Sequence, residues 1–223
     1  MPLNVNSAKK SSAPKKAGPV PLDGVQLGVL VQVVDLGVQP GGEYQGEKKP
    51  DCQQIRLTYE LPNDVHDFDG EEKPLLISET FNFSSHELST CIKRINSIDP
   101  GLKISGGDFG KLVGTPVMIQ ITHRQGKGKH DGRTFANVAS VSPLMRGMTG
   151  PDDTYNPKYS YSPDEHDEEV WEKIPEFLQT IINNRLDKRT SSPAASKAAP
   201  KPTPQAAPQD SAESDTDASG DDW

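Results

Sequence analysis

The chain has little hydrophobic material for its length. Of its 223 residues, 32% are hydrophobic and 6% aromatic, and the mean hydropathy is -0.67. A chain of this length holds one large domain or two small ones, and so polar a composition leaves much of it outside any core. We therefore expect the folded part to be clearly shorter than the chain.

Cysteine is scarce as well, which argues against a disulfide framework or a zinc site. Cys52 and Cys91 are the only two cysteines, and neither lies in CxxC spacing or near a histidine pair. We expect both to be reduced. The first 19 residues carry four lysines, no acid and no apolar run, so they predict neither a secretory signal nor a membrane span, and we expect an intracellular protein.

Catalytic signatures are missing too. The glycine-rich stretch before Leu112 fails as a phosphate-binding loop, because the motif's first glycine falls on Ser105 and its Ser or Thr after Lys111 falls on Leu112. No serine lies in a GxSxG turn, and the histidines show no metal-ligand spacing. The sequence predicts a protein that is not an enzyme and that uses no metal or cofactor.

Both ends of the chain are too polar to fold. Mixtures of Ser, Ala and Pro with Lys or Asp cannot bury enough apolar surface to offset chain entropy. We predict a disordered basic arm over residues 1–20, a folded domain over 21–189, and a Pro/Ala-rich linker with an acidic tail over 190–223.

Charge is segregated within the chain. The whole sequence carries a net charge of -8, yet residues 111–146 hold six Lys or Arg against one acid, a net charge of +5. The last 14 residues, 210–223, hold six acids and no base. This arrangement is typical of a protein that binds an anion in one region and offers an anion in another.

The folded part is dominated by alternating apolar and polar residues. This pattern predicts strands over residues 26–39, 53–61, 75–83, 116–124 and 133–141. Ser84 and Glu87 form a capping box that predicts a helix between the third and fourth strands. Residues 164–186 predict a C-terminal helix in two pieces, restarted at Pro175. The order predicts a mainly β protein with an OB-fold, a five-stranded barrel with a helix between strands three and four; a mixed five-stranded sheet with one helix is the alternative.

The turn between the last two predicted strands is the best local signal for a ligand. Residues 126–133 combine three glycines with three basic side chains, where OB barrels place a loop that contacts oligonucleotides. Glycines allow the backbone to approach phosphates, and lysines bind phosphates without reading sequence. An ordinary solvated hairpin turn is the alternative interpretation.

Strand parity and aromatic residues complete the predicted interface. If Ile55 and Leu57 face the interior, Arg56 points outward, and Tyr59 shares the inward parity, so that its ring is expected to be at least partly buried. Tyr44 and Phe135, which lie near basic residues, are better placed to stack on bases. The predicted nucleic-acid-binding residues are Tyr44, Lys48, Lys49, Arg56, Tyr59, Phe81, Lys111, Arg124, Lys127, Lys129, Arg133 and Phe135.

Several stretches resemble a known family. They read VQVVDLGVQPGGEYQGEKKP, QQIRLTYELP, LLISETFNFSSHE, FANVASVSPL and EVWEKIPEFLQTII. Over about residues 20–186, the chain resembles a group of bacteriophage single-stranded DNA-binding proteins with an OB-fold. The resemblance implies a sequence-tolerant protein that coats and protects single strands in phage DNA replication, recombination and repair, in the cytoplasm of the infected bacterial host.

Members of that family share an acidic, disordered C-terminus that ends in an aromatic residue, usually Phe. This terminus docks on replication partners and competes with DNA for the protein's own groove. Here it corresponds to Asp221, Asp222 and Trp223, which implies partner binding, to a polymerase, helicase or recombination protein, at a terminal Trp. Two alternatives stay open: a strand-annealing recombination mediator, and an acidic protein-interaction module that acts on a host enzyme, which the basic block over 111–146 disfavours.

Overall fold

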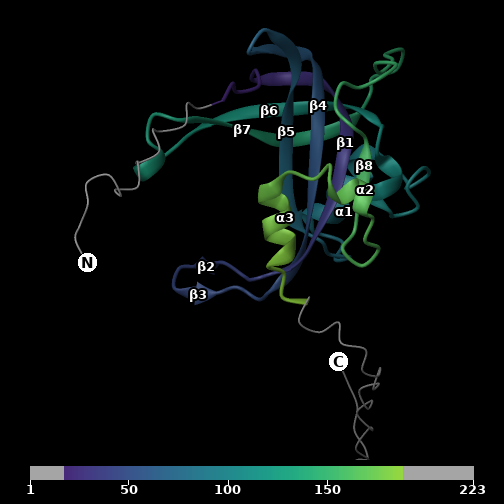
Figure 1. Cartoon of the computed structure of the whole chain (residues 1–223). Coiled ribbons are helices and arrows are strands. Elements are labelled where there is room, and N and C mark those ends of the chain that lie inside the picture. Colours follow the sequence, from purple (N-terminus) through teal and green to yellow (C-terminus); the bar gives the residue numbers. More distant parts are fainter. Residues whose placement is uncertain (1–17, 188–223) are drawn as a thin grey trace, which may run out of the picture. The chain divides into compact units, whose positions relative to one another are not determined.

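The computed structural model describes residues 18–187 (Figure 1). The predicted acidic tail, with Asp221, Asp222 and Trp223, lies outside the described residues, as does nearly all of the predicted basic arm. The side chains of Tyr44 and Lys129 lie outside the description too. Predictions about these residues stay predictions. Within the part of the chain that is described, no helix is long and apolar enough to cross a membrane.

One mainly antiparallel sheet forms the body of the protein, and all five predicted strands are present in it. In chain order its strands are β1 (Gly24–Gln39), β4 (Cys52–Phe68), β5 (Glu71–Asn82), β6 (Pro116–Gln125), β7 (Thr134–Pro143) and the short β8 (Tyr159–Tyr161). The hydrogen-bonded order is β5-β4-β1-β6-β7, and β8 pairs in parallel with β1. The mainly β class is therefore confirmed.

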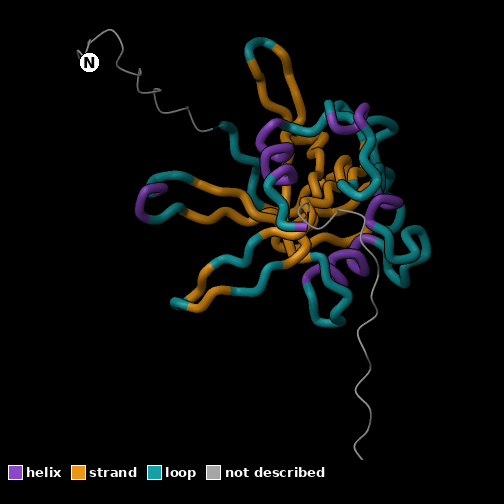
Figure 2. Tube along the Cα trace, turned by 60° about the horizontal axis from the view of Figure 1, so that its bottom comes forward, coloured by secondary structure: helices purple, strands orange, loops and turns teal. Residues whose placement is uncertain are grey.

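Three hairpins reach out from this sheet (Figure 2). The β4–β5 and β6–β7 hairpins are continuations of long strands. The third is a separate two-stranded sheet of β2 (Glu43–Tyr44) and β3 (Glu47–Lys48), inserted between β1 and β4. The β2–β3 and β6–β7 hairpins project toward the same side in both views, whereas the β4–β5 hairpin points another way (Figures 1 and 2).

The predicted closed barrel is not confirmed, because the sheet is open. β5 and β7 lie at the two ends of the hydrogen-bonded path, and no ladder joins them within residues 18–187. The two edge strands nevertheless approach each other, and α1 (Thr90–Ile98) packs against both. Side chains of α1, among them the buried Cys91, Ile95 and Ile98, cover the region where a barrel would close by backbone hydrogen bonds.

The start of α1 corrects the predicted capping box. The N-cap residue is Ser89, whose Oγ accepts a hydrogen bond from the backbone N of Ile92 at 3.2 Å. Ser84 instead accepts from the backbone N of His86, two residues on. A serine hydroxyl caps a local turn as readily as a helix, so the Ser84–Glu87 spacing was a wrong indicator of the helix start.

Alternation along the strands produces an apolar face on each side of β1. The main core lies on the inner face, where the predicted parity is confirmed. Five residues with this parity are at most 5% exposed: Ile55, Leu57, Val117, Ile119 and Ile121. On the outer face, Val34 and Leu36 lie in a second cluster with β8 and the helices α2 (Glu168–Trp171) and α3 (Glu176–Asn183). The two-piece C-terminal helix is thus confirmed, in a shorter form than predicted.

A buried carboxylate attaches the C-terminal part of the fold to β4. Glu60 is 1% exposed. Its side chain accepts hydrogen bonds from the backbone N of Tyr155 at 3.0 Å, the backbone N of Asn156 at 2.7 Å and the Asn156 side-chain amide at 2.7 Å. Because a buried charge is stable only when it is hydrogen-bonded, these contacts fix the loop before β8 on the outer face of the sheet.

We predict that Glu60→Ala lowers the free energy of unfolding by roughly 2–4 kcal/mol, because it leaves two backbone N–H groups without their charged acceptor. Urea denaturation followed by circular dichroism measures the change. Glu72→Ala, on the neighbouring strand β5 and exposed, is the matched control and changes stability by at most about 0.5 kcal/mol. Equal losses in the two variants would contradict the attachment role of Glu60.

Candidate nucleic-acid interface

The tip of the β6–β7 hairpin is a tight, glycine-dependent turn. It contains the short helix η3 (Gly128–His130), and the backbone N of Gly126 donates to the carbonyl of Arg133 at 2.7 Å. A Cβ on Gly126 would collide with the backbone carbonyl of His130. Gly132 has a φ of 75°, a value that favours glycine. The predicted turn is confirmed, and its glycines are required by its shape.

Basic side chains surround an aromatic ring on this hairpin. Arg124, Lys127 and Arg133 are exposed, and Phe135 is half-buried. The Arg124 guanidinium carbon lies 5.9 Å from the centre of the Phe135 ring, and the His130 ring meets Phe135 edge-on at 6.0 Å. A hollow of about 540 Å³ lies among Arg124, Lys127, His130, Phe135 and the adjoining backbone. An accessible ring flanked by cations suits a nucleobase with its phosphates.

The β2–β3 hairpin adds a second set of cations on the same side of the sheet (Figure 1). Lys48 and Lys49 are exposed there. The hairpin is held at its base by a hydrogen bond from Lys49 N to Gly42 O at 2.8 Å and by another from Gly41 N to Asp51 at 2.9 Å. Glu43 and Glu47 on the same hairpin reduce its net charge, so the β6–β7 hairpin is the more basic of the two.

Tyr59 is the clearest correction to the predicted interface. Its ring is fully buried, and its hydroxyl donates to Glu79 at 2.8 Å. Glu79 in turn binds Arg94 at 2.7 Å, and both of these side chains are largely buried. Burial, followed by the negative charge of Glu79, raises the pKa of Tyr59 well above its usual value. Tyr59 is therefore part of the core and is not accessible to a base, in line with the burial that its parity predicted.

Arg56 points outward as predicted and is half-buried. The helix α3 lies over it, and the Arg56 guanidinium carbon is 5.7 Å from the centre of the Phe177 ring. Its Nη1 donates to Thr80 at 3.2 Å, and burial lowers its pKa. α3 therefore partly covers the outer face of β4 at Arg56, where an oligonucleotide was expected.

Two further predicted residues lie elsewhere. Phe81 is half-buried and packs against the main core, with its ring 6.1 Å from that of Phe109. Lys111 is exposed on the short helix η2 (Phe109–Leu112), near that helix's last turn. The predicted residues that the structure brings to one side of the sheet, by the position of their hairpins, are Lys48, Lys49, Arg124, Lys127, Arg133 and Phe135.

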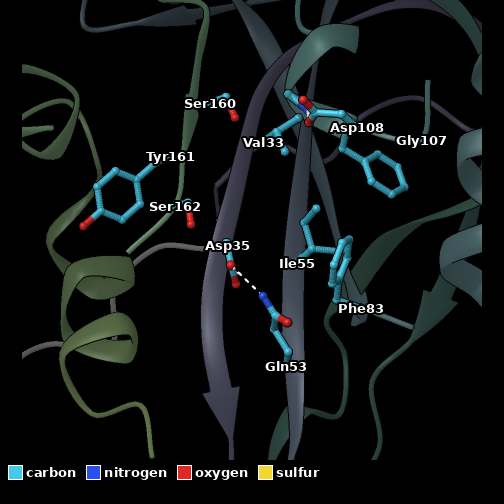
Figure 3. A pocket seen from close by; sticks show the side chains of 12 residues that line it. Val33, Asp35, Gln53, Ile55, Phe83, Gly107, Asp108, Ser160, Tyr161 and Ser162 are labelled. Carbon is cyan, nitrogen blue, oxygen red and sulfur yellow. Dashed lines mark hydrogen bonds between the residues drawn. The ribbon is translucent and has the colours of Figure 1, made fainter. Parts of the chain in front are cut away.

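Sequence reasoning missed a pocket where the inner face of the sheet ends (Figure 3). Its volume is about 200 Å³, and its walls include Val33, Asp35, Gln53, Ile55 and Phe83. Asp35 accepts hydrogen bonds from Gln53 Nε2 at 2.7 Å and from the backbone N of Gly37 at 2.8 Å. The sequence did contain a signal for this pocket. Asp35, two residues after Val33, and Gln53, two residues before Ile55, are polar residues at positions with inward parity.

No protein-family model, no curated protein and no solved structure matches the chain. Among residues 18–187, no group of three or more His, Cys, Asp or Glu side chains lies where it could hold a metal ion. Cys52 and Cys91 are unpaired thiols, and Cys91 is buried in α1.

We predict that Asp35→Asn stabilises the fold at neutral pH. Burial raises the pKa of Asp35, and the negative charges of Asp164 and Asp187 add to this, whereas hydrogen bonds from Gly37 and Gln53 act in the opposite direction. Such a carboxyl has a higher pKa in the folded than in the unfolded state. It does not affect stability at a pH below its unfolded-state pKa, and it destabilises the fold increasingly as the pH rises through its folded-state pKa.

Thermal denaturation at about pH 7.5 and about pH 4 measures this difference. The gain in Tm over the unsubstituted protein is expected to be larger at the higher pH. Asp23→Asn removes the same charge at an exposed position and serves as the control. A loss of stability in Asp35→Asn at about pH 7.5 would show that the hydrogen bonds outweigh burial.

Proposed function

We propose that the protein binds single-stranded DNA with little sequence preference, through the side of the sheet that carries the β2–β3 and β6–β7 hairpins. The supporting observation is the ring of Phe135 beside Arg124 and close to Lys127 on an exposed hairpin. Exposed Lys and Arg bind a chain of phosphates, and every base has a flat face that stacks on an aromatic ring. Neither contact depends on base identity.

The order of the strands supports the proposal that this sheet is a variant of the OB-fold. The order β5-β4-β1-β6-β7, with α1 between the third and fourth long strands and against both edges, is compatible with an OB barrel in which the two edge strands are not hydrogen-bonded to each other. In such barrels the connections between strands one and two and between strands four and five contact oligonucleotides. Here these connections are the β2–β3 hairpin and the tip of the β6–β7 hairpin.

The covered outer face of β4 changes where DNA is expected to bind. α3 lies over Arg56, and Glu60 holds the loop before β8 on the same face. We therefore place the strand on the two hairpins and the side of the sheet from which they project. The role proposed from the family resemblance is protection of single strands in phage replication, recombination and repair, with Asp221, Asp222 and Trp223 recruiting partners by an aromatic anchor flanked by charge.

We predict that the double variant Lys127→Ala/Arg133→Ala binds oligothymidylate about tenfold more weakly, because it loses two phosphate contacts. Affinity is measured by fluorescence anisotropy at salt concentrations from about 50 to 200 mM, and the slope of log affinity against log salt should become shallower by about 1.4. Lys173→Ala, exposed between α2 and α3, is the control and leaves the slope unchanged. Affinity that does not depend on salt in the unsubstituted protein would rule out the proposal.

We also predict that Phe135→Ala weakens binding to the same strand by about tenfold, the loss of one stacked base. The chain offers a matched control in Phe177→Ala, because Phe177 likewise carries an arginine over its ring but lies on α3. If Phe177→Ala reduced affinity more than Phe135→Ala, the strand would run over the C-terminal helices rather than along the β6–β7 hairpin.

A further inference from the structure

The inner face of the sheet becomes polar at one end. Along β1 and β4, inward positions are apolar as far as Val33 and Ile55, which belong to the main core. The next inward positions hold Asp35 and Gln53, which are hydrogen-bonded to each other at 2.7 Å. The core thus ends in an acceptor-rich wall at the pocket of about 200 Å³ rather than in a hydrophobic plug.

The opposite wall of the pocket comes from the loop that leads into η2. The backbone of Gly110 lies so close to β8 that a Cβ there would be 2.8 Å from the Ser160 hydroxyl. Asp108 also lines the pocket, and its Oδ1 accepts from Gly110 N at 2.8 Å. The Phe83 ring, 46% exposed, lies beside Ile55 on the same side as Gln53 (Figure 3). The space is bounded by polar groups on two sides and by an accessible ring.

The chemistry of this lining selects for hydrogen-bond donors. Two carboxylates, Asp35 and Asp108, line the pocket, and none of its lining residues is Lys or Arg, so a phosphate group would be repelled. Each oxygen of Asp35 accepts one hydrogen bond from the protein, from Gly37 N or from Gln53 Nε2. Since an ionised carboxylate has about four acceptor sites, both oxygens can still accept from a ligand.

A guanine base matches these features best. It is flat, so it can stack on Phe83, and it presents two neighbouring donors, N1–H and the N2 amino group, to the two oxygens of one carboxylate. Adenine and cytosine place an acceptor next to their amino group, and thymine places its single N3–H between two carbonyls. Only guanine therefore gives Asp35 a bidentate partner.

We propose that this pocket receives one guanine base of the bound strand, so that a protein otherwise tolerant of sequence has one position with a base preference. The inference rests on the DNA binding proposed above. The β2–β3 hairpin arises between the end of β1 and the start of β4, the same strand ends that carry Asp35 and Gln53. In this proposal, a strand bound by Lys48 and Lys49 continues toward the pocket.

The test compares oligothymidylates of about 15 nucleotides that carry a central dG, dA or dC, bound by the full-length protein in an anisotropy titration. We expect the dG strand to bind about tenfold more tightly than the dA or dC strand. In Asp35→Asn this ratio falls to about one, because Asn offers one acceptor and one donor in place of two acceptors. The ratio is the readout because removal of a negative charge raises affinity for every strand.

Two controls keep the pocket and the proposed function separable. Asp23→Asn makes the same charge change at an exposed site and keeps the dG preference. Guanosine, which has the base but no phosphate, is added alone in an NMR saturation-transfer experiment and tests the pocket without a strand. A saturation-transfer signal that is lost in Asp35→Asn or in Phe83→Ala supports the pocket. This holds even if oligothymidylate does not bind and the proposed function fails. Equal affinity for the dG, dA and dC strands, with oligothymidylate bound, overturns the pocket and leaves the proposed function standing.

Discussion

Strand β1 carries apolar side chains on both faces, and each face has to be covered. Val33 points into the main core, whereas Val34 and Leu36 point to the other side, where α2, α3 and the tyrosines of the adjacent strand β8 pack against them. An antiparallel sheet commonly leaves one face to solvent, but burial of large aliphatic side chains favours a second layer. The buried Glu60 and its three hydrogen bonds hold the loop before β8 against β4.

Covering this face has a direct consequence for the proposed interface. Arg56 and Arg124 both lie on strands. In each case the guanidinium carbon is within about 6 Å of the centre of a phenylalanine ring. Arg56 faces a ring of the covering helix, whereas Arg124 faces a ring of its own hairpin, which extends beyond the covered region. The two cation–ring pairs therefore differ in their surroundings: one joins α3 to β4, and the other lies on an exposed hairpin and belongs to the interface that we propose.

The Asp35 pocket lies on the opposite face, where the core ends. Burial raises the pKa of Asp35, so its charge opposes folding at neutral pH, and a hydrophobic residue there would extend the core. A carboxylate kept in a cleft at the expense of stability is a common feature of binding sites. Together with the exposed ring of Phe83, it gives the sheet end what the basic hairpins lack, a carboxylate beside an accessible ring, and our proposal of a base preference is built on this pair.

The local pattern of residues determined the strands, the inward parity of Ile55 and Leu57, and the glycine turn of the β6–β7 hairpin, because alternation and backbone freedom act over a few neighbouring residues. Contacts between distant segments decided the rest. Tertiary packing left the sheet open with α1 against both edges, placed α3 over Arg56, and joined Asp35 to Gln53 across 18 positions of sequence. No local pattern encodes these outcomes, since each depends on which surface of one segment is buried by another.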